Sequence, residues 1–283
     1  MISRPSPDGP PADPAPRLQR ARGRAEVAVR HDGTAVRLER LFQQGSAKAI
    51  LPRVHGPVPE VVLVNTAGGV TGGDAFAWSL AAGDGAALVA TTQAAERVYR
   101  STGGPAEIRT RLALGTGAAL DWLPQETIVF DGGRLDRRID IDLAADSRLL
   151  AVETLVLGRT AMGETVATGA LSDQWRLRRA GRLIHAEALR AEGDIARATA
   201  GPATLAGGRA VSTVVLAAPG AADRRDEIRD LLKDEAHVAH GVSKKPDLLI
   251  VRLMGPDARA LRTTLIRLLM RLRGTALPRV WST

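Results

Sequence analysis

Residues 61–80 read VVLVNTAGGVTGGDAFAWSL, and the four glycines in this stretch separate two runs with the character of β-strands. The first run, residues 61–64, is continuously apolar. In the second run Phe76, Trp78 and Leu80 alternate with small residues, which is the period of a strand. A phosphate-binding loop would end in Gly-Lys-Ser/Thr or open a helix, and neither is found here. The pattern predicts a structural loop between strands.

Glycines in such a loop supply positive φ angles and close backbone approach. We therefore expect a positive φ at one or more of Gly68, Gly69, Gly72 and Gly73. Outward from this loop, residues 31–34 (His-Asp-Gly-Thr) separate two strand-like runs, 26–30 and 35–41, and predict a hairpin. Further turn signals occur at residues 83–85, 115–117, 145–147 and 180–181.

The spacing of these later turns indicates an internal repeat. The strands that follow them read GAALVATTQ (85–93), GAALDWLPQ (117–125), SRLLAVETL (147–155) and GRLIHAEAL (181–189). Each carries a leucine at a matching place, and a polar residue follows four or five positions later: Gln93, Gln125, Glu153 and Glu187. A period near 30 residues is typical of stacked, solenoid-like architectures. We predict a mainly β fold, a superhelical stack of antiparallel strands, with a conventional β-sandwich as the alternative.

Two segments depart from the β pattern and predict two α-helices near the C-terminus. Residues 222–237 place apolar side chains at helical spacing among charges. Residues 257–273 carry a stripe of five leucines opposite a basic face, with Asp257 as N-cap and Gly274 as stop. The leucines are Leu261, Leu265, Leu268, Leu269 and Leu272. We expect this helix to pack on the sheet with its basic face in solvent; a docking helix is the alternative.

The amino-acid composition limits the possible functions. The chain of 283 residues is 45% hydrophobic, which allows a sizeable core, and its formal net charge is +8. With 3% aromatic residues and no basic–aromatic interleaving, nucleic-acid binding is not expected. The absence of cysteine excludes disulfides, thiolate metal sites and cysteine nucleophiles. No signal peptide or membrane span is recognisable, so we expect a cytoplasmic protein. We take residues 1–20, which hold six prolines, as a disordered tail and residues 21–283 as one domain.

The groups with possible chemistry are carboxylates. His237 and His240 stand close together but have no third ligand at a recognisable spacing, and no serine lies in a nucleophile motif. Four stretches carry acidic residues beside glycines, glutamines or arginines: 65–74, 92–101 (TQAAERVYRS), 123–131 (LPQETIVFD) and 158–164 (GRTAMGE). Their charged residues are Asp74, Glu96, Glu126, Asp131, Arg159 and Glu164. Taken singly, each is most simply a loop cap or a surface ion pair.

Together and in this order, the four stretches resemble the UreD (UreH) family of urease accessory proteins. The resemblance covers about residues 24–283 and includes the terminal RGTALPRVW (273–281). It implies a β-superhelix with two helices and a role as a non-enzymatic scaffold in urease maturation. The partners it implies are apo-urease (UreABC), UreF and the GTPase UreG. It further implies that nickel passes through a tunnel, which makes the five carboxylates candidates for lining that route and Arg159 a candidate partner of one of them.

The residue types favour the passage of Ni²⁺ over its tight binding. Ni²⁺ binds imidazole and thiolate strongly, and the chain has no cysteine and no ordered histidine cluster. Hydrated Ni²⁺ can be guided by carboxylates and waters that hold it weakly. We expect no tightly bound cofactor, only transient Ni²⁺. The alternative from another class is a hydrolase or transferase that uses two carboxylates as acid and base, which would require both groups in one pocket with separated pKa values.

Overall fold

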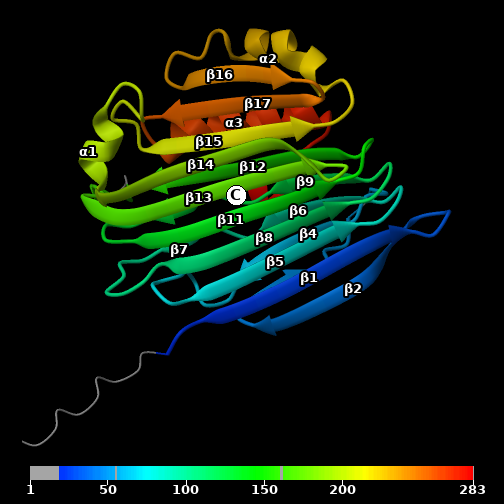
Figure 1. Ribbon diagram of the computed structural model, residues 1–283, viewed down its shortest axis with the longest axis horizontal. Coiled ribbons are helices and arrows are strands. Elements are labelled where there is room, and N and C mark those ends of the chain that lie inside the picture. Colours follow the sequence, from blue (N-terminus) through cyan, green and yellow to red (C-terminus); the bar gives the residue numbers. More distant parts are fainter. Residues whose placement is uncertain (1–18, 55, 160–161, 283) are drawn as a thin grey trace, which may run out of the picture.

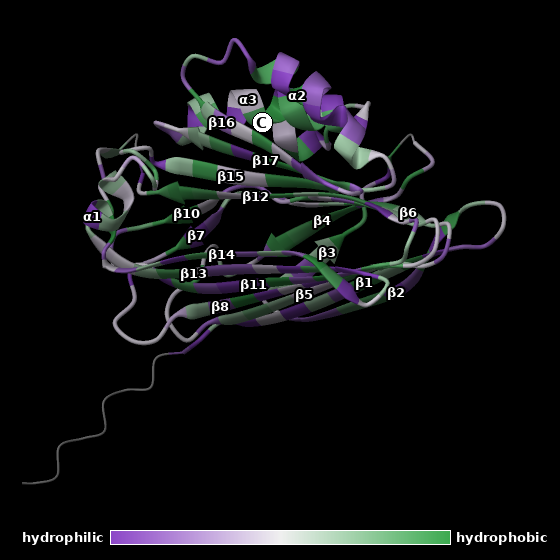
Figure 2. Ribbon diagram, turned by 45° about the horizontal axis from the view of Figure 1, so that its top comes forward, coloured by the Kyte–Doolittle hydropathy of each residue, from purple (hydrophilic) through white to green (hydrophobic). Residues whose placement is uncertain are grey.

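The computed structural model describes residues 19–54, 56–159 and 162–282, and in it two β-sheets pack face to face (Figure 1). Seven strands form one sheet and ten form the other. Figure 2 shows helices α2 (Arg225–Leu232) and α3 (Ala258–Arg273) over the outer face of the larger sheet, so the molecule has three layers. Residues 1–18 of the predicted disordered tail lie outside the described residues.

The seven-stranded sheet has the order β14-β13-β11-β8-β5-β1-β2. Its strands are β1 (Arg22–His31), β2 (Val36–Gly45), β5 (Ala75–Ala82), β8 (Ala106–Leu114), β11 (Arg134–Leu143), β13 (Thr168–Arg179) and β14 (Arg182–Asp194). The ten-stranded sheet has the order β16-β17-β15-β12-β9-β6-β4-β3, with β10 beside β12 and β7 beside β10. Its strands are β3 (Ala47–Ile50), β4 (Glu60–Asn65), β6 (Ala87–Thr92), β7 (Glu96–Val98), β9 (Ala119–Leu123), β10 (Thr127–Val129), β12 (Arg148–Leu157), β15 (Ala210–Ala217), β16 (Ala239–Lys245) and β17 (Leu248–Gly255).

The mainly β, superhelical stack is confirmed, but the predicted antiparallel orientation is wrong for its central strands. β1, β5, β8, β11 and β13 pair in parallel in one sheet, and β4, β6, β9 and β12 do so in the other. The turns that follow β5, β8 and β11 carry the chain into the opposite sheet rather than back along the same one. Successive coils therefore stack in the same direction, and antiparallel pairs occur at the two ends of the stack.

Three of the four proposed repeat units are confirmed in register. Leu88 pairs with Leu120 and Leu120 with Leu149, and all three side chains are buried. The turns before them stack as well, since the Gly85 amide donates to the Thr116 carbonyl at 2.8 Å. The fourth unit is wrong: the turn at residues 180–181 joins β13 to β14 as a hairpin within one sheet, and Leu183 is exposed. Hairpin turns and coil turns use the same residue types, so the sequence pattern did not separate them.

The glycine loop is structural, as predicted. Gly68, Gly69 and Gly73 have φ of 76°, 150° and 89°. A Cβ on Gly69 would lie 2.3 Å from the Tyr99 ring, so a side chain is excluded there by contact as well as by conformation. Asp74 closes the loop: its carboxylate accepts from the backbone amides of Ala21 and Thr71, both at 2.8 Å.

Both predicted C-terminal helices are present. α3 begins after the predicted N-cap Asp257, whose side chain accepts from the Ala260 amide, and it ends at Gly274 in the left-handed region. All five stripe leucines are at most 3% exposed. α2 ends at Leu232, so His237 and His240 are not on a common helix, and His240 lies in β16. A short third helix, α1 (Ile195–Ala200), was not predicted.

Most of the basic face of α3 is exposed to solvent, as predicted, but its arginines also form ion pairs. Arg262 pairs with Glu126, Arg267 with Glu235, and Arg273 with Asp121. Arg271 pairs with Glu227 of α2. These contacts tie the helix to the larger sheet and to its neighbouring segments, while the leucine stripe joins the apolar core on the outer face of that sheet.

Candidate functional site

The ten-stranded sheet is interrupted at one level in two neighbouring coils. β6 ends at Thr92 and β7 resumes at Glu96; β9 ends at Leu123 and β10 resumes at Thr127. β12 runs on without a break, pairing with β9 at residues 148–151 and with β10 at residues 155–157. The hydrogen-bond ladder between coils is therefore missing at one place, which is surrounded by residues 93–95, 124–126 and 152–154. We call this place the sheet gap.

A cavity of about 290 Å³ lies on the inner side of the sheet gap, between the two sheets. Its wall includes Trp78 and Thr110 from the smaller sheet and Trp122 and Glu153 from the larger one. Glu96 also lines it. A water molecule takes about 30 Å³ of liquid volume, so the space is large enough for a cation with several waters around it. We call it the inter-sheet cavity.

A buried arginine joins the two sheets at the wall of this cavity. Arg137 on β11, 3% exposed, donates to both carboxylate oxygens of Asp173 on β13, at 3.0 and 2.6 Å, and to Glu153 on β12. Its guanidinium also donates to the Thr127 hydroxyl, and the Trp122 indole donates to Glu153 at 2.9 Å. Burial raises the pKa of Glu153, against the opposing charge of Arg137. One guanidinium faces two carboxylates, so the ionised cluster has a net charge of −1.

Glu96 reaches the same cavity from the start of β7. Both of its carboxylate oxygens accept from the Asn65 amide at 3.1 Å, and no guanidinium is among its hydrogen-bond partners in the described structure. Burial raises the pKa of Glu96 from 4.5 to about 6, because the charged form loses water that the Asn65 amide only partly replaces. Near neutral pH this carboxylate is charged and faces the cavity with free lone pairs.

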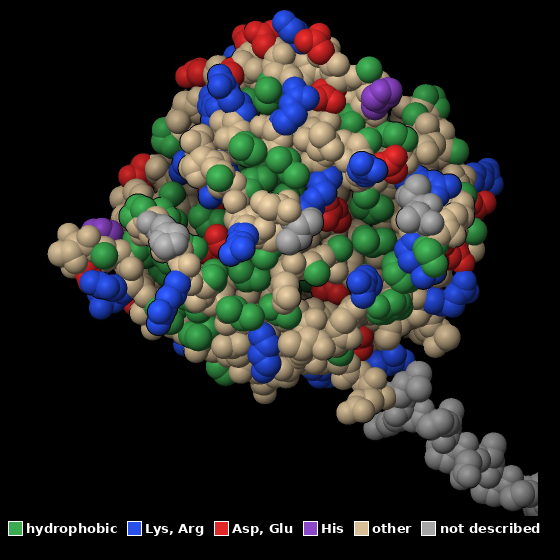
Figure 3. All heavy atoms as spheres, turned by 180° about the vertical axis from the view of Figure 1, so that it is seen from behind, with side chains coloured by type: hydrophobic (Ala, Val, Ile, Leu, Met, Phe, Trp, Pro, Cys, Tyr) green, Lys and Arg blue, Asp and Glu red, His purple; other side chains and the backbone are tan. Residues whose placement is uncertain are grey.

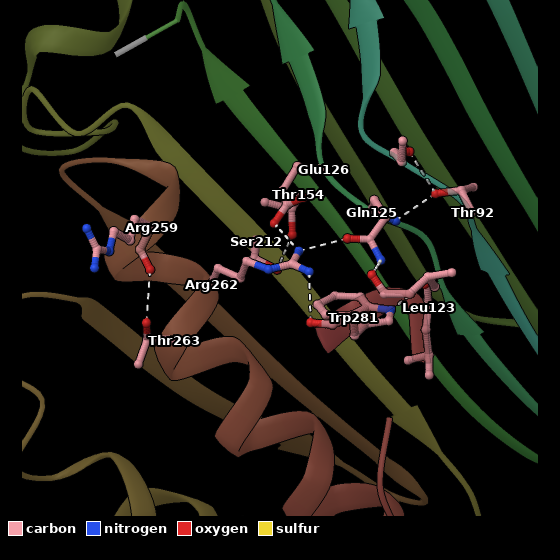
Figure 4. A network of polar contacts seen from close by, with 12 residues as sticks. Thr92, Leu123, Gln125, Glu126, Thr154, Ser212, Arg259, Arg262, Thr263 and Trp281 are labelled. Carbon is pink, nitrogen blue, oxygen red and sulfur yellow. Dashed lines mark hydrogen bonds and ion pairs between the residues drawn. The ribbon is translucent and has the colours of Figure 1, made fainter. Parts of the chain in front are cut away.

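On the outer side of the sheet gap, Arg262 of α3 donates hydrogen bonds to three acceptors (Figure 4). It donates to the Gln125 side-chain oxygen at 2.8 Å, to Glu126 at 2.7 Å and to the Trp281 carbonyl at 3.1 Å. The guanidinium also lies over the Trp281 ring, 4.8 Å from its centroid. A groove of about 440 Å³ opens here between the sheet gap and the start of α3. We call it the α3 groove.

Asp131, Arg159 and Glu164 form a separate cluster on the loops that follow β10 and β12. The Arg159 guanidinium donates to both oxygens of Glu164, at 2.8 and 3.2 Å, so the expected pairing of Arg159 with a motif carboxylate is found. Asp131 accepts from the Ala167 and Thr168 amides and pairs with Arg100. Hydrogen bonds from the Thr168 backbone to Asp131 and from Arg159 to Glu164 lower the pKa of these two carboxyls. This cluster holds loops together.

The structure thus places the six predicted residues at three separate locations. Glu96 and Glu126 lie at the sheet gap, and the Glu96 amide donates to the Glu126 carbonyl at 2.9 Å. Asp131, Arg159 and Glu164 share the loop cluster, and Asp74 caps the glycine loop. No sequence pattern pointed to Arg137 or Asp173. Glu153 was noticed only as a repeating polar residue, yet Gln93, Gln125 and Glu153 all border the sheet gap. That recurrence was the signal that could have located the site.

Nothing in the described residues resembles a preformed metal centre. No group of three or more His, Cys, Asp or Glu side chains is placed to hold an ion in that part of the chain. In the same part, no helix has the length and apolar character that a membrane crossing requires. Figure 3 shows the face opposite that of Figure 1, where Lys and Arg side chains stand among apolar and acidic ones rather than in one stripe.

Comparison with known proteins agrees with the motif resemblance. The family described as UreD urease accessory protein matches residues 21–282. A urease accessory protein UreD of Rhizobium rhizogenes is 48% identical over 267 residues, covering 94% of this chain and 97% of that protein. Similar proteins of the same description occur in Dinoroseobacter shibae, 48% identical with 94% of each chain covered, and in Methylobacterium sp. strain 4-46, 45% identical over the full length of both.

Proposed function

The chain belongs to the UreD family of urease accessory proteins, and from this premise we propose that it is a cytoplasmic scaffold that carries hydrated Ni²⁺ toward the active site of apo-urease. In this proposal Ni²⁺ is cargo and not a resident cofactor. The partners are apo-urease, UreF and UreG, as the motif resemblance implies. The protein itself performs no bond-making step.

One observation carries the passage proposal: the inter-sheet cavity is lined by carboxylates that do not assemble into a metal site. Glu96 and Glu153 both line it, and each is held by donors from the protein. A cation inside meets carboxylate oxygens, which attract it and its waters, and also the guanidinium groups of Arg97 and Arg137, which keep its binding weak. It finds no set of imidazole or thiolate ligands that would strip those waters and trap it.

Arg137 contributes to this balance. By engaging Glu153 and Asp173 it supplies the opposite charge that these buried carboxylates need, because an isolated buried charge would be costly. It also occupies the position between them that a bare cation would otherwise take. The cluster offers no bidentate pocket, and this favours a weakly held, mobile ion.

An enzymatic role is less well supported by the same geometry. Acid–base catalysis needs two carboxyl groups free to exchange protons in one pocket. Glu153 has one oxygen on the Trp122 indole and the other on Arg137, and is therefore not free. Glu96 remains as a single available carboxylate in the cavity.

Co-expression tests the proposal. Urease produced with the accessory proteins and this chain should contain more nickel and hydrolyse urea faster than urease produced without it. In pull-down experiments the chain should co-purify with UreF and urease. Equal nickel content with and without the chain would contradict a maturation role. If nickel is lost only because the complex fails to assemble, the scaffold role stands and the proposed nickel passage is refuted.

A further inference from the structure

The outermost strand of the larger sheet has one unpaired edge beside a helix. β16 pairs with β17 along its whole length and with no second strand in the described structure. Figure 1 shows it as the last strand of the stack, with α2 next to it. Lysines often protect such an edge, but here Lys244 and Lys245 stand at one end only, and residues 239–243 hold no lysine, proline or acidic residue. The backbone N–H and C=O groups on this edge are therefore open to an added strand.

A hollow of about 510 Å³ lies between this edge and α2. Arg229 of α2 and Lys233, which follows the last residue of the helix, form one wall. The other wall is His240, Gly241 and Val242 of β16. Neither Arg229 nor Lys233 has a hydrogen-bond or ion-pair partner among the residues that the structure describes. The hollow therefore offers two available cations, and no carboxylate lines it.

The register of β16 shows which side chains of an added strand would enter the hollow. His240 and Val242 lie opposite Leu253 and Val251 of β17. Residues directly opposite each other share a face of the sheet, and these two apolar residues belong to the core on the outer face. Figure 2 shows α2 over that face. Because side chains alternate along a strand, every second side chain of an added strand would lie on the side of the two cations.

We propose that the β16 edge binds an extended acidic segment of a partner protein by strand addition, with alternate carboxylates of that segment on Arg229 and Lys233. Backbone pairing gives affinity for an extended chain, and the unpaired cations select carboxylates at every second position. A second copy of this chain fits poorly, because each copy would bring the same cations to the contact. The proposal does not depend on nickel passage, since neither cation lines the inter-sheet cavity or the α3 groove.

A labelled peptide tests the site in solution. The probe is a fluorescein-labelled peptide of alternating glutamate and threonine with the same length as β16, and the control peptide has glutamine in place of each glutamate. Both are titrated with the purified full-length chain, and binding is followed by fluorescence anisotropy. We expect saturable binding of the glutamate peptide that weakens as salt is added, because exposed charges are screened. The glutamine peptide should bind much more weakly.

Two substitutions made together remove the cations and leave the strand edge unchanged. In the double variant Arg229→Ala and Lys233→Ala, the dissociation constant of the glutamate peptide should rise about tenfold, as for the loss of a charge-assisted hydrogen bond. Arg225→Ala is the matched control, since Arg225 is on the same helix and does not line the hollow. Its dissociation constant should stay within about twofold of the parent value, because salt screens a charge outside the contact.

Hydrogen exchange separates strand addition from simple charge attraction. An added strand should slow exchange at the free amides of residues 239–245, whereas ion pairing with α2 alone would leave these amides exchanging freely. Binding without this protection would overturn the proposal and leave only a site for anions such as inorganic phosphate. The absence of saturable binding of the glutamate peptide to the parent chain would also overturn it. So would an equal loss of affinity in Arg225→Ala, because the attraction would then not be located at the hollow.

Discussion

At the scale of single residues, each predicted carboxylate is defined by its partners. Asp74 accepts only from backbone amides in the described structure, Glu126 from an arginine, and Glu96 from an amide side chain and the Arg97 backbone. A backbone-capping carboxylate supports the local fold, because its hydrogen bonds satisfy amides that would otherwise lack partners. A carboxylate at a cavity wall with spare lone pairs can act on a passing cation. Glu96 and Glu126 are therefore the carboxylates we assign to passage.

Glu126→Gln should lower the nickel content of co-expressed urease severalfold while the chain still co-purifies with its partners. The amide keeps the size of the side chain and still accepts from Arg262, but it removes the negative charge at the outer side of the sheet gap. Metal analysis of purified urease measures the effect.

Glu235→Gln provides the control for Glu126→Gln. Glu235 also pairs with an arginine of α3, Arg267, but it does not line the inter-sheet cavity or the α3 groove. Equal nickel loss in both variants would show that the effect comes from weakening the attachment of α3 and not from charge at the sheet gap.

Glu96 makes stability depend on pH in a predictable direction. Its pKa is raised from 4.5 to about 6, so the native state binds a proton that the unfolded state has released between these values. Its contribution to the free energy of unfolding therefore falls as pH rises through that interval, by about 2 kcal/mol at most. Denaturant titrations from pH 4 to 7 should show this fall in the wild-type chain and not in Glu96→Gln. Parallel pH profiles in the two proteins would contradict the assignment.

At the scale of elements, the break repeated in two coils positions the site. Gln93 follows the end of β6, and Pro124 and Gln125 follow the end of β9. The adjoining coil of β12 places Glu153 at the same level. A stack of similar coils brings equivalent positions of each repeat together. Polar residues that recur along the sequence are thereby brought together at the sheet gap.

The second decisive element is α3, whose leucine stripe covers the outer face of the larger sheet. Leu265 is fully buried there, at 0% exposure. Leu265→Asp should destabilise the fold by about 3–5 kcal/mol, because the site offers no partner for a buried charge. Met270→Asp on the same helix is the control, since Met270 is 46% exposed and its replacement should cost little. Thermal unfolding followed by circular dichroism compares them, and equal melting temperatures would refute the packing argument.

At the scale of the whole molecule, the two sheets are joined by apolar packing and by ionic contacts, among them a buried cluster around Arg137. Arg137 on one sheet binds Glu153 on the other, and Asp173 completes the arrangement. A buried ion pair adds little net stability when intact, yet removing one partner leaves charges that nothing compensates. The cluster therefore holds the sheets in register while it shapes the wall of the cavity.

Arg137→Leu should consequently lower the free energy of unfolding by about 3–5 kcal/mol, since Glu153 and Asp173 remain buried without their cation. Arg134→Leu in the same strand removes a pair with Glu192 that is largely exposed and should change stability by less than about 1 kcal/mol. Urea unfolding curves give both values. If the unfolding curve of Arg137→Leu is the same as that of the wild-type chain, water reaches the cluster freely.

The sequence by itself determined the features that depend on neighbouring residues. The β class, the turns, the glycine loop with its positive φ angles, and α3 with its cap and stop follow from periodicity and turn chemistry within a few positions. Tertiary structure alone decided the parallel stacking and the partners of the charged groups. Arg137 and Asp173 are 36 residues apart and Arg262 and Gln125 are 137 apart. No local pattern encodes such pairs, because they form only when the coils stack and α3 folds back over the sheet.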